Sequence, residues 1–256
     1  MPSEQFKNVV IFGASQGIGR ALAEEYSANG YNLVLLSRNI NAIKDISGNI
    51  NSACGKCFYN QCDVSDYNSV KAGTEFANTS LGSIDIAILN AGIGRPEWMS
   101  SFRSAEFKRV VTINTFGMAH CLEFLIPIMK KQGYGKIAGV TSLGDVRGYA
   151  GSSSYSSSKA AASILLESAR VELKQLNINV ITIRPGFVRT AMTDKNEFKM
   201  PFLMSAEKAA KIIIRGIAKN KSIVQFPLFT VMATRIVKNL PNWIYDRIMV
   251  KARAVK

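Results

Sequence analysis

Short apolar segments alternate with longer amphipathic segments along most of the chain. The short segments are hydrophobic at successive positions, which is typical of strands that helices cover on both faces of a sheet. In the longer segments, apolar residues recur every three or four positions, the spacing of a helix with one buried face. This alternation predicts an α/β fold, a doubly wound parallel sheet with helices on both faces.

The pattern also places the individual elements. The first apolar segment ends in glycine, and the helix after it ends at Asn29-Gly30, a pair typical of helix C-termini. The predicted strands are 8–13, 32–38, 56–64, 84–92, 136–142, 178–186 and 222–227. The predicted helices are 17–30, 66–79, 104–131, 155–176 and 205–219, and the region after 227 is also expected to be helical.

No feature of the sequence divides the chain. It has no Pro/Ser/Gly-rich linker, and its 256 residues, 47% of them hydrophobic, are enough for one well-buried core. We expect a single domain over 1–256 with a helical C-terminal extension over 226–256. The N-terminus lacks the pattern of a signal peptide, and no stretch reaches ~18 uninterrupted apolar residues. These features favour a cytoplasmic protein.

A glycine-rich turn, GASQGIG, follows the first predicted strand and opens the first predicted helix. Backbone N–H groups in such a turn, with the positive partial charge of the helix N-terminus, suit a pyrophosphate. The spacing differs from the G-x-G-x-x-G fingerprint, so a structural turn without a ligand remains an alternative. The residues expected to contact a dinucleotide here are Gly13, Ser15, Gln16, Gly17, Ile18 and Gly19.

The end of the second predicted strand bears on the choice of dinucleotide. It reads Ser37-Arg38-Asn39, without the carboxylate that bonds the ribose hydroxyls of NAD. The Arg38 guanidinium can pair with a 2′-phosphate and stack on adenine. We therefore expect NADP(H) to be preferred over NAD(H), and because Gln16 is not basic this expectation rests mainly on Arg38.

Asp63 and Val64 stand at the end of the third predicted strand. The Asp63 carboxylate is placed to meet the adenine amino group. An equal alternative is that it caps a helix beginning near Ser65.

Tyr155 and Lys159 are four residues apart and therefore share one face of a helix. A tyrosine of pKa ~10 is a poor base at neutral pH, but a nearby ammonium lowers the pKa by favouring the phenolate. Such a tyrosine can donate a proton to a carbonyl oxygen while hydride arrives at the carbon. The spacing alone is common by chance, so an ordinary exposed helical turn is the alternative, with the serines between the two as spacers.

Two upstream residues strengthen the catalytic interpretation. Ser142 ends the fifth predicted strand, where its hydroxyl can hold a substrate oxygen. Asn114 lies inside a helical pattern, where an amide can bond backbone carbonyls or water. The predicted strands end at one edge of the sheet, which is where doubly wound folds bind ligands.

With these motifs the chain resembles the short-chain dehydrogenase/reductase family, in its branch of ~250 residues with a Rossmann fold. The resemblance covers roughly 7–220 and is carried by GASQGIG, NAG, YSSSK and PGFVRT in that order. It implies that Tyr155 is the general acid/base, that Lys159 lowers the pKa of Tyr155 and bonds the nicotinamide ribose, and that Ser142 positions the carbonyl. It implies that Asn114 holds a water in a proton relay.

The resemblance also implies further cofactor contacts. They are Asn90, Ala91 and Gly92 beside the adenine, and Pro185, Gly186, Val188 and Thr190 beside the nicotinamide. Two departures from the family pattern, Phe12 and Leu89, replace no group that does chemistry. The alternative function is a non-catalytic NAD(P)-binding regulatory or interaction protein on the same fold.

The segment 191–210 matches the region that forms a substrate lid in relatives. Its apolar side chains suit an irregular hydrophobic ligand, and they are Met192, Phe198, Met200, Phe202, Leu203 and Met204. We expect a hydrophobic carbonyl or alcohol substrate, a 3-oxoacyl group, ketone or lipid-like molecule. The alternative is that these residues only pack on the fold.

The formal net charge is +14, and residues 184–256 contribute most of it, with 15 Lys/Arg against 4 Asp/Glu. This excess suits an acidic partner, but the chain shows no nucleic-acid recognition motif. The tail places Leu228, Met232, Ile236 and Leu240 at helical spacing. Peripheral membrane contact is one interpretation, carried by Trp243, Tyr245, Arg247, Lys251, Arg253 and Lys256. A helix packed on the core or on a second subunit is the alternative.

The resemblance implies a homodimer or homotetramer, formed through the helices at 104–131 and 155–176. The four cysteines are Cys54, Cys57, Cys62 and Cys121. They lack the paired spacing of a structural zinc site, so we expect no metal and interpret them as thiols of a reducing cytoplasm.

Overall fold

The computed structural model describes residues 7–51, 55–195 and 200–254, with the side chains of 51, 195 and 251–254 left out. Several residues singled out in the sequence therefore lie outside the described part: Cys54, Phe198 and Lys256 entirely, and Lys251 and Arg253 as side chains.

A seven-stranded parallel sheet forms the centre of the fold, in the order β3-β2-β1-β4-β5-β6-β7. This order confirms the predicted doubly wound α/β fold, because the chain runs outward from β1 in one direction and then returns to build the other half. The strands are β1 (Asn8–Phe12), β2 (Asn32–Ser37), β3 (Cys57–Gln61), β4 (Ile86–Leu89), β5 (Gly135–Val140), β6 (Ile178–Pro185) and β7 (Ile223–Phe226).

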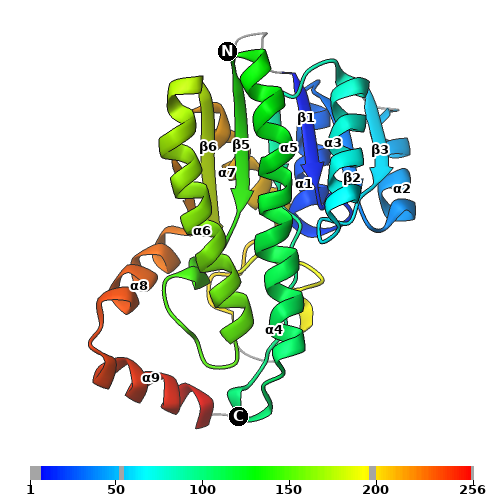
Figure 1. Cartoon of the computed structure of the whole chain (residues 1–256). Coiled ribbons are helices and arrows are strands. Elements are labelled where there is room, and N and C mark those ends of the chain that lie inside the picture. Colours follow the sequence, from blue (N-terminus) through cyan, green and yellow to red (C-terminus); the bar gives the residue numbers. More distant parts are fainter. Residues whose placement is uncertain (1–6, 52–54, 196–199, 255–256) are drawn as a thin grey trace.

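Helices cover both faces of this sheet (Figure 1). On one face lie α1 (Gly17–Ala28), α2 (Ile40–Asn51) and α7 (Ala206–Ala218). On the other lie α3 (Tyr67–Leu81), α5 (Gly117–Gln132) and α6 (Ser153–Leu173), and α4 (Ser104–Val111) precedes α5 beyond the edge of the sheet (Figure 1).

Strand β1 shows why successive positions are apolar. Val9 and Ile11 belong to one hydrophobic core, while Val10 and Phe12 belong to the core on the opposite face. Side chains alternate across a strand, so a strand between two helical layers needs hydrophobic residues at every position.

Helix α2 is absent from the sequence prediction. Its sequence, INAIKDISGNIN, is rich in Asn, Ser and Gly, which are weak helix formers. Ile43, Ile46 and Ile50 nevertheless form a buried stripe against the core. Tertiary packing of this stripe stabilises a helix that local propensity does not favour.

The helical segment Ser104–Gln132 joins α4 to α5 through a π-helical turn, Thr112–Phe116. It is long and apolar enough to cross a membrane by length and composition. Its residues Ile113, Leu125 and Met129 are buried in the core that α3 and α6 share. It is therefore a core helix of the fold.

After β7 the chain forms α8 (Leu228–Asn239) and α9 (Asn242–Ala254), which extend away from the sheet below α6 (Figure 1). Val231 is buried, whereas Leu228, Met232 and Ile236 are exposed. Tyr245, one of the residues considered for membrane contact, is buried, and its hydroxyl donates a hydrogen bond to the Gly148 carbonyl, 2.6 Å away.

Candidate active site

Tyr155 stands at the start of α6, close to the carboxyl end of β5. Ser142, which follows β5, lies near enough to influence the phenol, and its hydroxyl accepts a hydrogen bond from the Gly144 N–H over 3.0 Å. Its ring packs against Gly94, where a Cβ atom would come within 2.8 Å of the tyrosine Cδ2. The absence of a side chain at Gly94 therefore leaves room for the phenol ring.

Burial removes water from the Tyr155 phenol and raises its pKa above the ordinary value, and the nearby Ser142 hydroxyl opposes this effect. The sequence predicted the opposite direction, a lowering by Lys159. Desolvation dominates, because the Lys159 Nζ lies 5.9 Å from the tyrosine ring centroid. The phenol therefore keeps its proton at neutral pH and is available as a proton donor.

Lys159 is buried one helical turn after Tyr155. Its Nζ donates a hydrogen bond to the Val140 carbonyl oxygen over 2.8 Å. Burial lowers the pKa of Lys159 to about 8, and the Asp145 carboxylate opposes this shift. Asp145 is itself held by an ion pair with Arg184 and a hydrogen bond from Ser163.

Asn114 lies in the π-helical turn and is fully buried. Its amide Oδ1 accepts from the Ile93 N–H over 2.8 Å, and its Nδ2 donates to the Ile93 carbonyl at 2.8 Å and to Ser158 Oγ at 2.9 Å. Both amide N–H donors are thereby used. Asn114 therefore joins the loop after β4 to helix α6.

Ser158 was interpreted as a spacer, and the structure shows that this is wrong. Its hydroxyl accepts from Asn114 and donates to the Tyr155 carbonyl over 2.8 Å. It therefore connects the π-helical turn to α6. The sequence signal that could have identified Ser158 is its place directly before Lys159 in the chain.

Glu97 is a second functional candidate that the sequence did not reveal. It is buried in the loop after β4 and accepts hydrogen bonds from Ser154 Oγ and, at 3.3 Å, from the Arg103 N–H. Its own N–H donates to the Gly151 carbonyl over 2.9 Å. These bonds join the loop to the first turn of α6, immediately before Tyr155.

The glycine-rich turn has the shape that a pyrophosphate requires. Gly13 and Gly17 have φ angles of +86° and +56°, and a Cβ at Gly19 would lie 2.1 Å from the Gly13 carbonyl oxygen. Within the described residues, the Gln16 side chain makes no capping bond to α1, so the first N–H groups of the helix remain available. The turn fits a dinucleotide.

Asn90 supports this turn from β4. Its Nδ2 donates to the Gly13 carbonyl over 2.8 Å, and a Cβ at Gly13 would contact Ala91 at 2.7 Å. The next residue, Gly92, lies beside the catalytic groups: a Cβ there would be 3.2 Å from Lys159 Nζ. The NAG segment thus connects the glycine-rich turn to the surroundings of Lys159.

The family model described as short chain dehydrogenase matches residues 7–200. The chain belongs to the short-chain dehydrogenase/reductase family. It is therefore an oxidoreductase of carbonyl or alcohol groups that uses a nicotinamide dinucleotide, NAD or NADP.

Similar proteins cover between 72% and 96% of this short-chain dehydrogenase. An uncharacterized oxidoreductase of Myxococcus xanthus is 30% identical and covers 96% of the chain and 97% of its own length. The 7alpha-hydroxysteroid dehydrogenase of Escherichia coli K12 is 33% identical over 72% of each chain. A solved 7alpha-hydroxysteroid dehydrogenase in complex with NADH and 7-oxo glycochenodeoxycholic acid is 27% identical, with a TM-score of 0.81 over 86% of this chain and 93% of that one.

The remaining predicted cofactor residues of this dehydrogenase line the same edge of the sheet. Thr190 packs on the phosphate turn, since a Cβ at Gly17 would lie 2.8 Å from its Cγ2. Arg38 is exposed just beyond β2. The others are Ser15 and Ile18 in the turn, Ser37 at the end of β2, Val64 after β3, Pro185 at the end of β6, and Gly186 and Val188 just after it.

Asp63 does not cap the third helix, so that alternative is wrong. Its Oδ1 accepts from the N–H of Ser65 over 2.9 Å and from its hydroxyl over 2.7 Å. Helix α3 begins later, at Tyr67, and its N-cap is Asp66, which accepts from the Ser69 N–H. The adenine contact of Asp63 stays a prediction.

The region 191–210 is hydrogen-bonded to the segment 186–190 that follows β6. The Met204 N–H donates to the Phe187 carbonyl over 3.0 Å, and the Arg189 N–H donates to the Met204 carbonyl over 2.8 Å. Met192 lies near Tyr155. A Cβ at Gly94, on which the Tyr155 ring packs, would be 3.5 Å from the Met192 sulfur. Both ends of the segment therefore lie beside the site.

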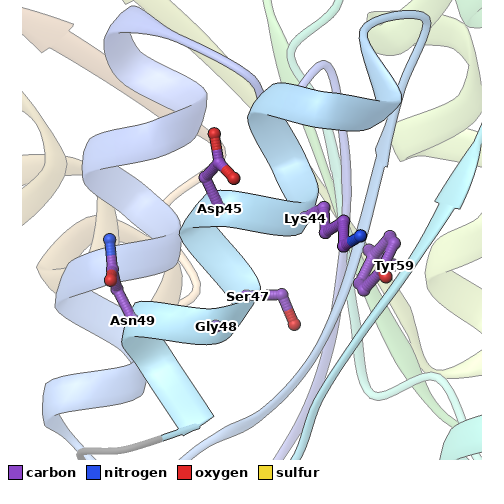
Figure 2. A pocket seen from close by; sticks show the side chains of 6 residues that line it. All are labelled: Lys44, Asp45, Ser47, Gly48, Asn49 and Tyr59. Carbon is purple, nitrogen blue, oxygen red and sulfur yellow. The ribbon is translucent and has the colours of Figure 1, made fainter.

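A hollow of about 560 Å³ lies outside this site, between α2 and β3. Figure 2 shows Lys44 directed toward Tyr59, while Asp45 and Asn49 point elsewhere. None of the catalytic or cofactor residues lines it.

No three His, Cys, Asp or Glu side chains come together in the part of the chain that the structure describes. Cys57, Cys62 and Cys121 are buried thiols within the two cores.

Proposed function

We propose that this protein is an NADP-dependent oxidoreductase that reduces a hydrophobic carbonyl compound or oxidises the matching secondary alcohol. The proposal rests on one arrangement: the protonated Tyr155 phenol beside Ser142, one helical turn from Lys159 and at the same edge of the sheet as the glycine-rich turn. A dinucleotide in that turn reaches the same edge of the sheet as the phenol.

In the reduction, Tyr155 donates its proton to the carbonyl oxygen of the substrate. Ser142 holds that oxygen by a hydrogen bond and stabilises the negative charge that develops on it. The bound nicotinamide supplies the hydride at the carbonyl carbon. Lys159 places a positive charge beside the phenolate that remains, which favours the transfer.

Asn114 acts as a positioning residue in this proposal. Its side chain holds the Ile93 backbone and Ser158, and through Ser158 the first turn of α6. Both amide donors are engaged in these bonds, so any relay water would depend on other atoms. Its contribution is the fixed position of Tyr155 and Lys159.

The cofactor preference rests on Arg38. It is exposed at the end of β2, where the adenosine ribose of a bound dinucleotide lies in this fold. A guanidinium there pairs with a 2′-phosphate, whereas NAD offers it no anion. NADP(H) is therefore the proposed cofactor, although the solved 7alpha-hydroxysteroid dehydrogenase holds NADH.

The proposed substrate is hydrophobic, a ketone, 3-oxoacyl group or lipid-like molecule enclosed by a lid over 191–210. Met192 lies beside Gly94 and Tyr155, and Met204 packs against the core near the cofactor segment. Flexible methionine side chains adapt to irregular apolar ligands. The steroid substrate of the similar E. coli dehydrogenase belongs to this chemical class.

We also propose a homodimer or homotetramer assembled through α5 and α6. Phe116, Ile164 and Val171 are large apolar residues exposed on or next to these helices. Paired copies would bury them. A cytoplasmic location is proposed in agreement with the buried thiols, and the C-terminal region is proposed to contact membranes peripherally.

A substrate panel tests the enzymatic proposal. NADPH oxidation is followed with steroids, long-chain ketones, 3-oxoacyl thioesters and sugars, for the parent protein, Tyr155→Phe and the matched control Tyr67→Phe. We expect turnover of hydrophobic carbonyls, a loss of about 10²-fold or more in Tyr155→Phe, and none in the control. Full turnover by Tyr155→Phe would contradict the assignment of the acid, and NADPH binding without turnover of any carbonyl would favour the non-catalytic alternative.

A further inference from the structure

Helix α8 carries an apolar face that the protein leaves open to solvent. Leu228, Phe229, Met232 and Ile236 are 54–69% exposed, and their spacing places them on one side of the helix. Val231 on the opposite side is buried. The helix is therefore attached to the fold by one face and presents a second hydrophobic face outward.

This face continues onto the proposed substrate lid. The ring of Phe202 stacks on the ring of Phe229, with centroids 5.4 Å apart and planes 18° from parallel. Phe202 and its neighbour Leu203 are exposed. The backbone of Phe202 has a φ of +57°, which residues other than glycine rarely adopt. We call Phe202, Leu203, Leu228, Phe229, Met232 and Ile236 the docking face.

The outward orientation of α8 is held by bonds to the active-site loop. Arg147, in the loop that follows Ser142, donates to the Val237 carbonyl at 3.1 Å, to the Leu240 carbonyl at 2.7 Å and to Asn242 Oδ1 at 2.7 Å. Its guanidinium lies 3.9 Å from the ring centroid of Tyr245. These contacts hold both C-terminal helices, so the docking face is a fixed surface.

Basic residues accompany the docking face. Arg235 lies three residues after Met232 and is its neighbour on the helix surface, and Lys238 and Arg247 are exposed nearby in the chain. Within the described residues none of the three forms an ion pair. Asp246 is the single acidic residue from 226 to 256.

The positive charge beside the docking face indicates whether a second copy of the chain or a lipid surface binds there. In a two-fold dimer the same patch meets itself, so Arg235, which borders the patch, would approach the cations of the second copy. Like charges at such an interface repel. An anionic lipid surface attracts these cations and accepts the aromatic and aliphatic side chains at the level of its headgroups.

We propose that the docking face binds the surface of an anionic membrane and brings the lid into contact with the lipid. The membrane contact then lies on α8 and the lid, and a hydrophobic substrate can enter the site from the bilayer. The docking face gives the proposed peripheral membrane contact a location, and the route of entry rests on the proposed oxidoreductase function.

Vesicle sedimentation tests the contact with no turnover required. The full-length protein is mixed with phosphatidylglycerol/phosphatidylcholine vesicles and with pure phosphatidylcholine vesicles at low and high salt. We expect binding to the anionic vesicles that weakens with salt, and little binding to the neutral ones. Absence of binding to anionic vesicles at low salt would overturn the proposal.

Paired variants locate the contact. Met232→Gln with Ile236→Gln removes the centre of the docking face, and Met99→Gln with Ile223→Gln replaces the same two exposed residue types elsewhere. We expect the first pair to weaken vesicle binding tenfold or more and the second to leave it unchanged. Lys238→Gln should weaken it about fivefold and the exposed Lys71→Gln should not.

Two results point to a different answer. Equal binding by the Met232/Ile236 variant and its control would exclude the docking face. A lower oligomeric state of that variant in light scattering, with no vesicle binding by the parent, would identify the face as a contact between copies and contradict the proposal. NADPH oxidation with a water-soluble carbonyl, measured in parallel without vesicles, reports on the proposed function independently.

Discussion

The Lys159 ammonium donates a hydrogen bond to the main-chain oxygen of Val140, 2.8 Å away, at the end of strand β5. The bond holds the Lys159 ammonium in place, but burial still lowers the pKa of Lys159 to about 8. A charged group that water no longer solvates destabilises the folded state, so this lysine gives the stability a dependence on pH.

The sign of that dependence follows from the direction of the shift. Between pH 8 and about 10.5 the unfolded chain binds more protons at Lys159 than the folded protein, so its contribution to the free energy of unfolding rises with pH. Over this window the gain is about 3 kcal/mol. Below pH 8 both states are protonated and the contribution is constant.

Denaturant unfolding of the parent protein and Lys159→Met at pH 8 and pH 10 measures this term. Other groups also titrate in the window, so the quantity of interest is the difference between the two proteins. We predict that the parent gains stability relative to Lys159→Met as the pH rises. A constant difference would show that Lys159 is not desolvated.

The raised pKa of Tyr155 predicts different pH profiles for the two directions of the reaction. Reduction needs the protonated phenol, which is present at neutral pH, so its kcat/KM should stay level from pH 6 to 8. Oxidation needs the phenolate, so its kcat/KM should rise about tenfold for each pH unit over the same range. Both are measured with NADPH or NADP⁺ and one substrate pair. A level oxidation profile would contradict the role of Tyr155 as base.

Replacing Arg38 tests the cofactor preference. Arg38→Gln removes the guanidinium proposed to pair with the 2′-phosphate, at a cost of about 1.5–3 kcal/mol for a hydrogen bond to a charged group. We expect the Kd for NADPH, measured by fluorescence titration, to rise tenfold or more, and the Kd for NADH to stay the same. Lys71→Gln on α3 controls for the loss of one positive charge. Equal affinity of the parent for both cofactors would remove Arg38 from this role.

Ser158→Ala tests the connection between the π-helical turn and α6. The substitution leaves one buried N–H of Asn114 without its acceptor, which costs about 1–3 kcal/mol. We predict a lower free energy of unfolding and a lower kcat, with NADPH affinity retained. The control is Ser157→Ala, because Ser157 is exposed on the same helical turn. Equal stability and kcat for the two variants would return Ser158 to the role of a spacer.

Arg147→Met tests what holds the C-terminal helices. It removes the bonds to Val237, Leu240 and Asn242, and we expect a loss of about 1–3 kcal/mol and faster proteolysis between α8 and α9. The exposed Arg103→Met serves as the control. Unchanged proteolysis would show that other contacts fix these helices.

The sequence alone determined the fold and the order of the chemical groups along it. Continuous apolar strands require helices on both faces, and a glycine-rich turn after the first strand places a phosphate site at a helix N-terminus. The spacing of Tyr155 and Lys159 places them on one helix face whatever the surroundings. These inferences depend on neighbours along the chain, which the sequence contains.

The tertiary structure decided the partners and the surroundings of those groups. Ser158 meets Asn114 across 44 residues, and Arg147 meets Leu240 across 93. Burial of Lys159 and exposure of Met232 likewise depend on which elements pack against their helices. Helical spacing shows which residues share a face but not what covers it, and both desolvation and long-range hydrogen bonding depend on that cover.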